Sequence, residues 1–346
     1  MDEVSLLEGL LRAYSPTDAE QPAVVYLTEA MRAMGFQAEV DETGNAVGWR
    51  GEGLRQIVLL GHIDTVPGEI PVRREGDLLY GRGAVDAKGP LACFTAAVSS
   101  LSIPADWQVV VIGAVGEEGD SRGARGILDR YRPAYAIIGE PSGWDRVTLG
   151  YKGSLLLAYR VEQTLAHPAA QIENAPQRAV AFWNRLTAAA NEWNRPYQRT
   201  FDQVTPVLRR MQSGEDGFGG WAELLINLRL PVWLSPAQAF AEISALAEGA
   251  AVQMLDSVPA YLGEKNTAPV RAFLSAIRAA GGKPAFSLKS GTADLNLVAP
   301  VWNCPAVAYG PGDSNLDHTP SEHISLSEYR HSIAVLKEVL RQLMQV

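Results

Sequence analysis

Side chains that can bind metal ions follow several apolar runs in this sequence. The run IVLLG at residues 57–61 is followed at once by a histidine, and the runs VVVIGAVG and AYAIIG are followed by glutamates. A further aspartate lies in the glycine-rich segment YGRGAVDAKGP. The residues concerned are His62 and Asp64, Asp86, Glu117 and Glu118, and Glu140. Imidazole and carboxylate groups in this mixture are typical ligands of divalent metals such as Zn²⁺.

A cluster of these groups would need cations, because several anions close together are costly unless they are neutralised. His318 follows another apolar run and glycine loop, PAVAYGPG, and is the natural second histidine, whereas His323 is as readily a surface residue and His331 is given no function. Two metals about 3.5–4 Å apart can share a carboxylate and make water nucleophilic. One of the adjacent glutamates Glu117 and Glu118 can then bind metal while the other acts as general base.

These side chains require strands whose carboxyl ends meet at one edge of a sheet. The apolar runs at 57–61, 108–115 and 134–139 alternate with helical patterns, including one near 124–131. Buried strands that alternate with helices predict a mostly parallel sheet with helices on both faces, and ligands bind outside the carboxyl ends of such strands. Ser15 or Thr17 is placed to cap the helix predicted at 23–36. The fold class is therefore α/β.

An inserted domain interrupts this pattern. From residue 154 the order becomes strand, helix, strand, strand, helix, strand, which is typical of an α+β layer with an antiparallel sheet and two helices. The α/β pattern resumes near residue 265. We therefore predict a catalytic metal-binding domain at 1–153 and 265–346, and an inserted lid or dimerisation domain at 154–264.

Composition excludes several classes of function. The 346 residues carry a formal net charge of −9, which argues against a nucleic-acid surface because such binding relies on Lys and Arg. No apolar stretch approaches the roughly 18 residues of a membrane span, and the acidic start lacks the basic region of a secretory signal, so we expect no membrane contact and a cytoplasmic location. Cys93 and Cys304 are interpreted as small core residues.

Five motifs in order give a family resemblance. The segments GHIDTVPG, GRGAVDAKG, GEEG, GEPS and DHTPSE resemble the motif set of the M20 metallopeptidases and amidohydrolases, over the whole chain. The resemblance implies two divalent metals, Zn²⁺ foremost with Co²⁺ as the alternative. The implied ligand sets are His62, Asp86 and Glu140 for one metal and His318, Asp86 and Glu118 for the other. It also implies Glu117 as general base and a cis peptide bond after Asp86. Asp64 would accept the ring N–H of His62.

The resemblance also implies residues that contact the substrate. Family members use a lid histidine, often from the second subunit of a lid-mediated homodimer, to polarise the scissile carbonyl, and His167 is the lid histidine of this chain. A carboxylate-bearing product such as lysine needs a guanidinium and an acidic group. Arg271 and Asp294, the latter in the segment SGTADLN, are the candidates. A surface arginine and a helix-capping aspartate are equally good interpretations.

Within the family, GRGAVDAKGPLACF and KSGTADLN look most similar to the hydrolases that release lysine or ornithine from the terminal glutamate of an acidic amino-group carrier protein, in lysine or arginine biosynthesis. Because this chain is acidic too, docking would need a local basic patch. Acetylornithine deacetylase, succinyl-diaminopimelate desuccinylase or a dipeptidase is the alternative activity, and a non-catalytic M20-like binding protein is the alternative class. No G-x-S-x-G elbow or phosphate-binding loop supports a serine hydrolase or nucleotide binding.

Overall fold

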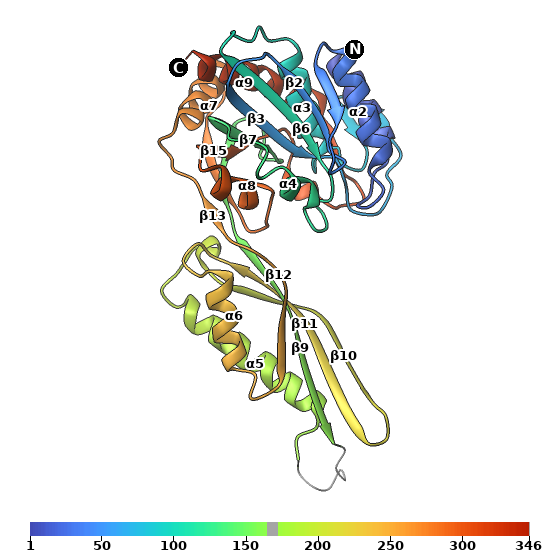
Figure 1. The fold of residues 1–346 in the computed structure, drawn as a ribbon, viewed down its shortest axis with the longest axis vertical. Coiled ribbons are helices and arrows are strands. Elements are labelled where there is room, and N and C mark those ends of the chain that lie inside the picture. Colours follow the sequence, from blue (N-terminus) through green and yellow to red (C-terminus); the bar gives the residue numbers. More distant parts are fainter. Residues whose placement is uncertain (165–171, 346) are drawn as a thin grey trace. The chain divides into compact units, whose positions relative to one another are not determined.

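The computed structural model describes residues 1–164 and 172–345, and the chain divides into two compact units (Figure 1). The larger unit comprises Met1–Gly150, Gly263–Leu288 and Ala293–Val346. The smaller unit comprises Tyr151–Leu262 and also takes up Lys289–Thr292. The ends of the long segment Tyr151–Leu262 adjoin neighbouring points of the larger unit, where the Gly263 N–H donates to the Leu149 carbonyl at 2.8 Å. The smaller unit is thus an insertion with neighbouring ends.

The larger unit is built on one mixed sheet. Its strands are β1 (Gln37–Val40), β2 (Ala46–Arg50), β3 (Arg55–His62), β6 (Trp107–Ala114), β7 (Tyr135–Gly139), β8 (Arg146–Tyr151), β14 (Ala285–Lys289) and β15 (Ala306–Ala308). The strand order is β1-β2-β6-β3-β7-β15-β8, with β14 paired to β8, and the short strand β13 (Tyr261–Leu262) lies where the chain returns. The central strands β6, β3, β7 and β15 are parallel, whereas both edges are antiparallel. Their carboxyl ends therefore meet at one edge.

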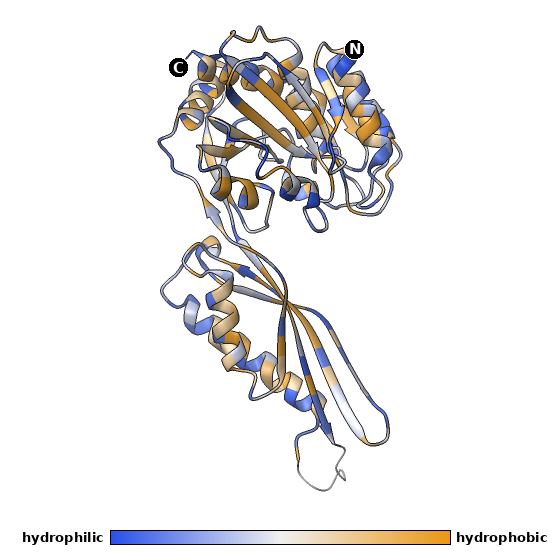
Figure 2. Cartoon of the chain, in the orientation of Figure 1, coloured by the Kyte–Doolittle hydropathy of each residue, from blue (hydrophilic) through white to orange (hydrophobic). Residues whose placement is uncertain are grey.

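Helices cover both faces of this sheet, whose central strands are mostly apolar and buried. Every residue from Ile57 to His62 in β3 is buried, so neither face meets water there, and Figure 2 shows the central strands as mainly hydrophobic. The helices are α1 (Glu3–Arg12), α2 (Gln21–Ala33), α3 (Lys88–Ser99), α4 (Arg122–Gly126), α7 (Ala268–Ala279), α8 (Leu295–Trp302) and α9 (Leu326–Met344). The predicted α/β class with a mostly parallel sheet and an α+β insertion is confirmed.

Two local expectations were wrong. The helix predicted near 124–131 ends already at Gly126, since two glycines in five residues weaken it. Neither Ser15 nor Thr17 caps α2, whose N-cap position is Glu20. The Ser15 hydroxyl instead donates to the Ile63 carbonyl, and the Thr17 hydroxyl donates to Asp64. Both hydroxyls therefore hold the segment that follows β3.

A small separate sheet lies in the larger unit beside the glycine-rich segment. It has the order β16-β5-β4, with strands β4 (Arg73–Glu75), β5 (Leu78–Tyr80) and β16 (His323–Ser325). All its pairs are antiparallel, and His323 pairs with Tyr80. This pairing brings the segment just before β16 to the segment just after β5, although more than half of the chain separates them.

The smaller unit has its own sheet and core. In its described part four strands run in the order β10-β11-β9-β12, all antiparallel, and two α-helices accompany them. The elements are β9 (Gly153–Thr164), α5 (Ala175–Asn194), β10 (Thr205–Glu215), β11 (Gly219–Leu230), α6 (Pro236–Ala245) and β12 (Ala251–Val258). Strand residues such as Leu157 and Ile226 pack with Phe182 of α5 in a core separate from that of the larger unit. Among the described helices of both units, none is long and apolar enough to cross a membrane.

Candidate metal centre

The parallel strands bring the predicted ligands to one edge of the central sheet. In the register of the sheet His62 at the end of β3 pairs with Ala114 of β6, so Glu117 and Glu118 follow just beyond its level. Gly61 pairs with Gly139 of β7, which places Glu140 level with His62. Glycine relieves close packing at the latter pair, because a Cβ on Gly139 would lie 3.0 Å from Phe94 Cε2 and 3.2 Å from the Gly61 Cα. The apolar run therefore ends in a histidine because its end is where the functional groups gather.

Asp86 lies between the two histidines. Its Oδ1 is 3.1 Å from His62 Nε2, and its Oδ2 is 3.0 Å from His318 Nε2. His318 Nε2 is also 2.9 Å from Glu118 Oε1. The peptide bond from Asp86 to Ala87 is cis, as predicted. One carboxylate thus faces both imidazoles with a different oxygen for each, which is the arrangement expected of a ligand shared by two cations.

The main-chain carbonyl of Asp64, rather than its carboxylate, is the nearer acceptor for the ring of His62. Its Nδ1 lies 2.9 Å from the main-chain carbonyl of Asp64 and 3.6 Å from that residue's carboxylate. Because a carbonyl only accepts, Nδ1 carries a proton and Nε2 is the nitrogen available to a metal. The Asp64 carboxylate instead accepts the N–H groups of Glu117 at 3.0 Å and Glu118 at 3.1 Å, and the Thr17 hydroxyl at 2.8 Å. Asp64 therefore fastens the turn that carries both glutamates.

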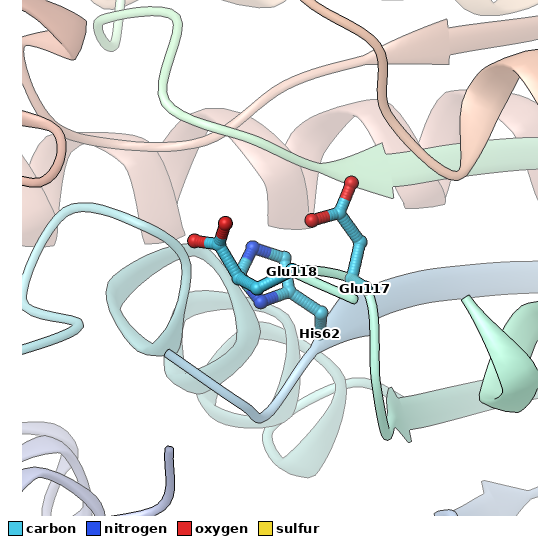
Figure 3. A group of neighbouring side chains, drawn as sticks. All are labelled: His62, Glu117 and Glu118. Carbon is cyan, nitrogen blue, oxygen red and sulfur yellow. The ribbon is translucent and has the colours of Figure 1, made fainter. Parts of the chain in front are cut away.

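Three overlapping groups of side chains in the described residues bring their ligand atoms within 4.8 Å of one another. They are His62, Asp86 and Glu140; Asp86, Glu118 and His318; and His62, Glu117 and Glu118. The first two are the ligand sets implied by the sequence resemblance, and they share Asp86. In Figure 3 the carboxylates of Glu117 and Glu118 diverge beside the imidazole of His62. Burial differs across the centre: His62 is buried, whereas the side chain of His318 is 51% exposed.

The electrostatics of this cluster fit a pair of cations. Burial raises the pKa of Glu117 and of Glu140 well above the usual range. Repulsion from neighbouring carboxylates raises both pKa values further, whereas the positive charge of His62 lowers them. Hydrogen bonding to Asp86 raises the pKa of His318 to about 9. Within the described residues no lysine or arginine pairs with these glutamates. The two imidazoles are therefore the cationic partners that the described residues offer to this cluster, and the mixture of imidazole and carboxylate donors suits zinc.

Asp294 belongs to the same neighbourhood. It is 2% exposed, and its Oδ1 is buried without a hydrogen-bond partner among the described residues. It occupies the N-cap position of α8 but accepts no capping hydrogen bond, so the capping interpretation is wrong. Its charge raises the pKa of both Glu117 and Glu140, and burial raises its own pKa to about 7. A buried carboxyl oxygen without a hydrogen-bond partner is costly, so Oδ1 of Asp294 is available to a donor from a bound molecule.

The remaining candidates lie apart from this cluster. Arg271 is exposed on α7, and its guanidinium donates to Asn266 Oδ1 at 2.8 Å. No contact among the described residues joins it to the carboxylates, and its role stays a prediction. His167 lies outside the described residues. His323 lies against Tyr80 and His331 lies against Trp144, each with its ring tilted to the partner ring, and both cysteines are free.

A family model described as peptidase family M20/M25/M40 matches residues 58–342, which include all the clustered side chains. The chain belongs to the M20 family. The family and the class of enzyme predicted from the sequence, a metal-dependent hydrolase, are thereby confirmed. This M20 protein resembles the M20 family metallo-carboxypeptidase Sso-CP2 of Sulfolobus solfataricus, with a TM-score of 0.80, 17% sequence identity and coverage of 100% of both chains. That likeness confirms the fold.

Two curated relatives of this M20 protein are similar over nearly their whole length. A LysW-lysine hydrolase of Deinococcus radiodurans is 44% identical over 337 residues, which cover 94% of this chain and 92% of the relative. A LysW-lysine/LysW-ornithine hydrolase of Sulfurisphaera tokodaii is 29% identical over 324 residues, which cover 93% of this chain and 90% of the relative.

Proposed function

We propose that this M20 protein hydrolyses the amide between the α-amino group of lysine or ornithine and the terminal glutamate of an amino-group carrier protein. The observation that carries the proposal is the 44% identity, over 94% of the chain, to a LysW-lysine hydrolase. We identify LysW in that name with the carrier expected from the sequence. The cluster around Asp86 supports the chemistry, because it offers two ligand sets and a separate carboxylate.

The proposal gives each clustered side chain a role. His62, Asp86 and Glu140 would hold one Zn²⁺, and His318, Asp86 and Glu118 would hold the other, with Co²⁺ as the alternative metal. Bound there, the cations would supply Lewis-acid polarisation of the scissile carbonyl and would make water more acidic. Glu117 takes the proton of the attacking water and then gives it to the leaving α-amino group. Asp64 keeps Glu117 in place through its main-chain N–H.

A comparison of substrates tests the proposal. We expect carrier-linked lysine or ornithine to be hydrolysed with a higher kcat/KM than acetylornithine, and the released amino acid can be measured by chromatography. Substrates are discriminated by the ratio of these constants. A preference for acetylornithine, succinyl-diaminopimelate or a dipeptide would replace the proposed activity by that alternative. A metal-loaded protein inactive on all of them would favour the binding-protein class.

Asp294 is proposed to bind the side-chain ammonium of the released amino acid. We expect Asp294→Asn to lower kcat/KM for lysine-linked substrate by about 10–100-fold relative to an uncharged acyl substrate. A hydrogen bond to a charged group contributes about 1.5–3 kcal/mol, and 1.4 kcal/mol corresponds to tenfold. Steady-state kinetics on both substrates measure the ratio.

A true capping aspartate provides the control for this variant. Asp2 accepts the N–H groups of Val4 and Ser5 at the start of α1. Asp2→Ala should lower the melting temperature and leave the ratio of the two substrates unchanged. Equal losses of Asp294→Asn on both substrates would remove Asp294 from the specificity site while leaving the hydrolase proposal intact.

The proposed homodimer rests on the family resemblance, as does carbonyl polarisation by His167. Light scattering on the purified protein measures the oligomeric state. If His167 acts from the second subunit, mixing His167→Ala chains with Glu117→Gln chains should restore activity, because one of the two sites in each mixed dimer then has both groups. No restoration in a proven mixed dimer would place His167 in its own subunit's site or in none.

A further inference from the structure

A second buried carboxylate, Glu322, holds the main chain of Asp86. Glu322 is 0% exposed. Its Oε1 accepts the N–H of Val85 at 2.9 Å and the N–H of Asp86 at 3.1 Å. Its Oε2 accepts from Arg82 Nη1 at 2.9 Å. A carboxylate this deep is tolerated because donors meet both oxygens.

The segment that supplies Glu322 also supplies a proposed metal ligand. Glu322 follows His318 in the motif DHTPSE, and Arg82 Nη1 also donates to the Thr319 carbonyl at 3.1 Å. Arg82 further donates through Nε to the Gly68 carbonyl at 2.9 Å. The Glu322–Arg82 pair therefore joins the segment of His318 to the segment of Asp86.

The consequence lies in the side chain of Asp86. Its carboxylate must present one oxygen to each imidazole, at 3.1 Å and 3.0 Å, and its direction depends on where its own main chain is held. Glu322 fixes the main-chain N–H of Asp86 and of the residue before it. Without this acceptor the two N–H groups would have to find other hydrogen-bond partners, which would shift the loop. The Asp86 carboxylate would then no longer be held in one direction.

We propose that Glu322 is a positioning residue for the two-metal centre, acting through the main chain of Asp86 rather than by contact with metal or substrate. The inference rests on the proposed metal-binding role of Asp86. It predicts that metal affinity depends on a hydrogen-bond acceptor at position 322, even when the ion pair with Arg82 has been removed.

Two double variants isolate the acceptor. E322Q/R82M and E322M/R82M both lose the ion pair and the bonds of Arg82, so neither leaves an unpaired buried charge. Gln and Met have similar lengths, but only Gln can accept the two N–H groups. We expect zinc affinity, measured by competition with a chromophoric chelator, to be about 10–100-fold weaker in E322M/R82M than in E322Q/R82M.

The outcomes separate this inference from the proposed metal centre. Equal zinc affinity in the two double variants would overturn the positioning role, whether or not both are weaker than the wild type. A wild-type protein that binds no zinc would instead overturn the metal centre and this inference with it. If E322M/R82M does not fold, Glu322→Asp gives a second test, since it keeps the charge and withdraws the acceptor by one methylene; unchanged zinc affinity there would also overturn the inference.

A similar carboxylate elsewhere in the larger unit provides the control. Asp41 accepts the N–H groups of Thr43 and Asn45, each at 2.9 Å, and pairs with Arg130 at 3.1 Å. Asp41→Asn should lower the melting temperature of the metal-free protein and leave zinc affinity unchanged. If Asp41→Asn lost as much zinc affinity as E322M/R82M, the effect of Glu322 would be explained by general stability. That result would overturn the proposal.

Discussion

Glu117→Gln is expected to keep both metals and to lose nearly all turnover. The amide preserves the shape of the side chain but cannot accept a proton from water, and a positioned general base contributes about 10²–10⁴-fold to the rate. We therefore expect kcat to fall by about that factor, measured as release of lysine from the carrier. Metal content, measured by elemental analysis after dialysis, should match the wild type.

Glu118→Gln is the matched control, because the two glutamates are neighbours and both have their N–H groups bound by Asp64. The Glu118 carboxylate lies 2.9 Å from His318 Nε2, so this substitution should weaken the binding of the metal that His318 would hold. If Glu117→Gln lost metal while Glu118→Gln kept both, the two roles would be exchanged.

Asp86→Ala is expected to abolish the binding of both metals and all measurable activity. This carboxylate is the member common to the two ligand sets, so its removal leaves each set with two residues. Glu140→Gln, by contrast, alters only the set that contains His62. Zinc titration should show no tight site in Asp86→Ala and one retained site in Glu140→Gln.

Chelation supplies the corresponding test on the unaltered chain. Dialysis against a chelator should remove activity, and zinc should restore it, because the described ligands can lose and regain a cation without covalent change. Asp86→Ala that retained two tightly bound zinc ions would show that the centre does not depend on a shared carboxylate.

The gathering of His62, Glu117 and Glu140 could be predicted from sequence because it follows from topology. Parallel strands that end in polar residues must bring those residues together, whatever the details of the loops. The register could not be predicted, and it is the register that puts Glu140 level with His62. His318 is expected at this edge because it follows the apolar run PAVAYGPG, whereas the role of Asp86 as a shared ligand is implied only by the family resemblance.

Residues that act through long-range contacts escaped the sequence analysis. Thr17 looked like a helix cap, but its hydroxyl binds Asp64, 47 positions away. Glu322 lies in a motif that was recognised for its histidine, and its contact with the Asp86 N–H spans 236 positions. For Asp294 the sequence leaves a substrate role and helix capping open; the missing cap rules out capping, and the substrate role stays a prediction. Local spacing carries no information on such contacts.

The insertion has a consequence for the order in which the chain can fold during synthesis. The described core residues of the smaller unit run from Leu155 to Ala247, with Val252 and Met254 packed against them, so they leave the ribosome well before α9. The core of the larger unit needs Leu336, Val339 and Leu340 of α9, which follows the insertion by more than 60 residues. Because domains generally fold as units, the insertion can fold before β15 and α9, which complete the larger unit, have been made. His318 and Glu322 are made shortly before α9, so a nascent chain cannot assemble the proposed centre within a folded larger unit until the residues up to α9 have been synthesised.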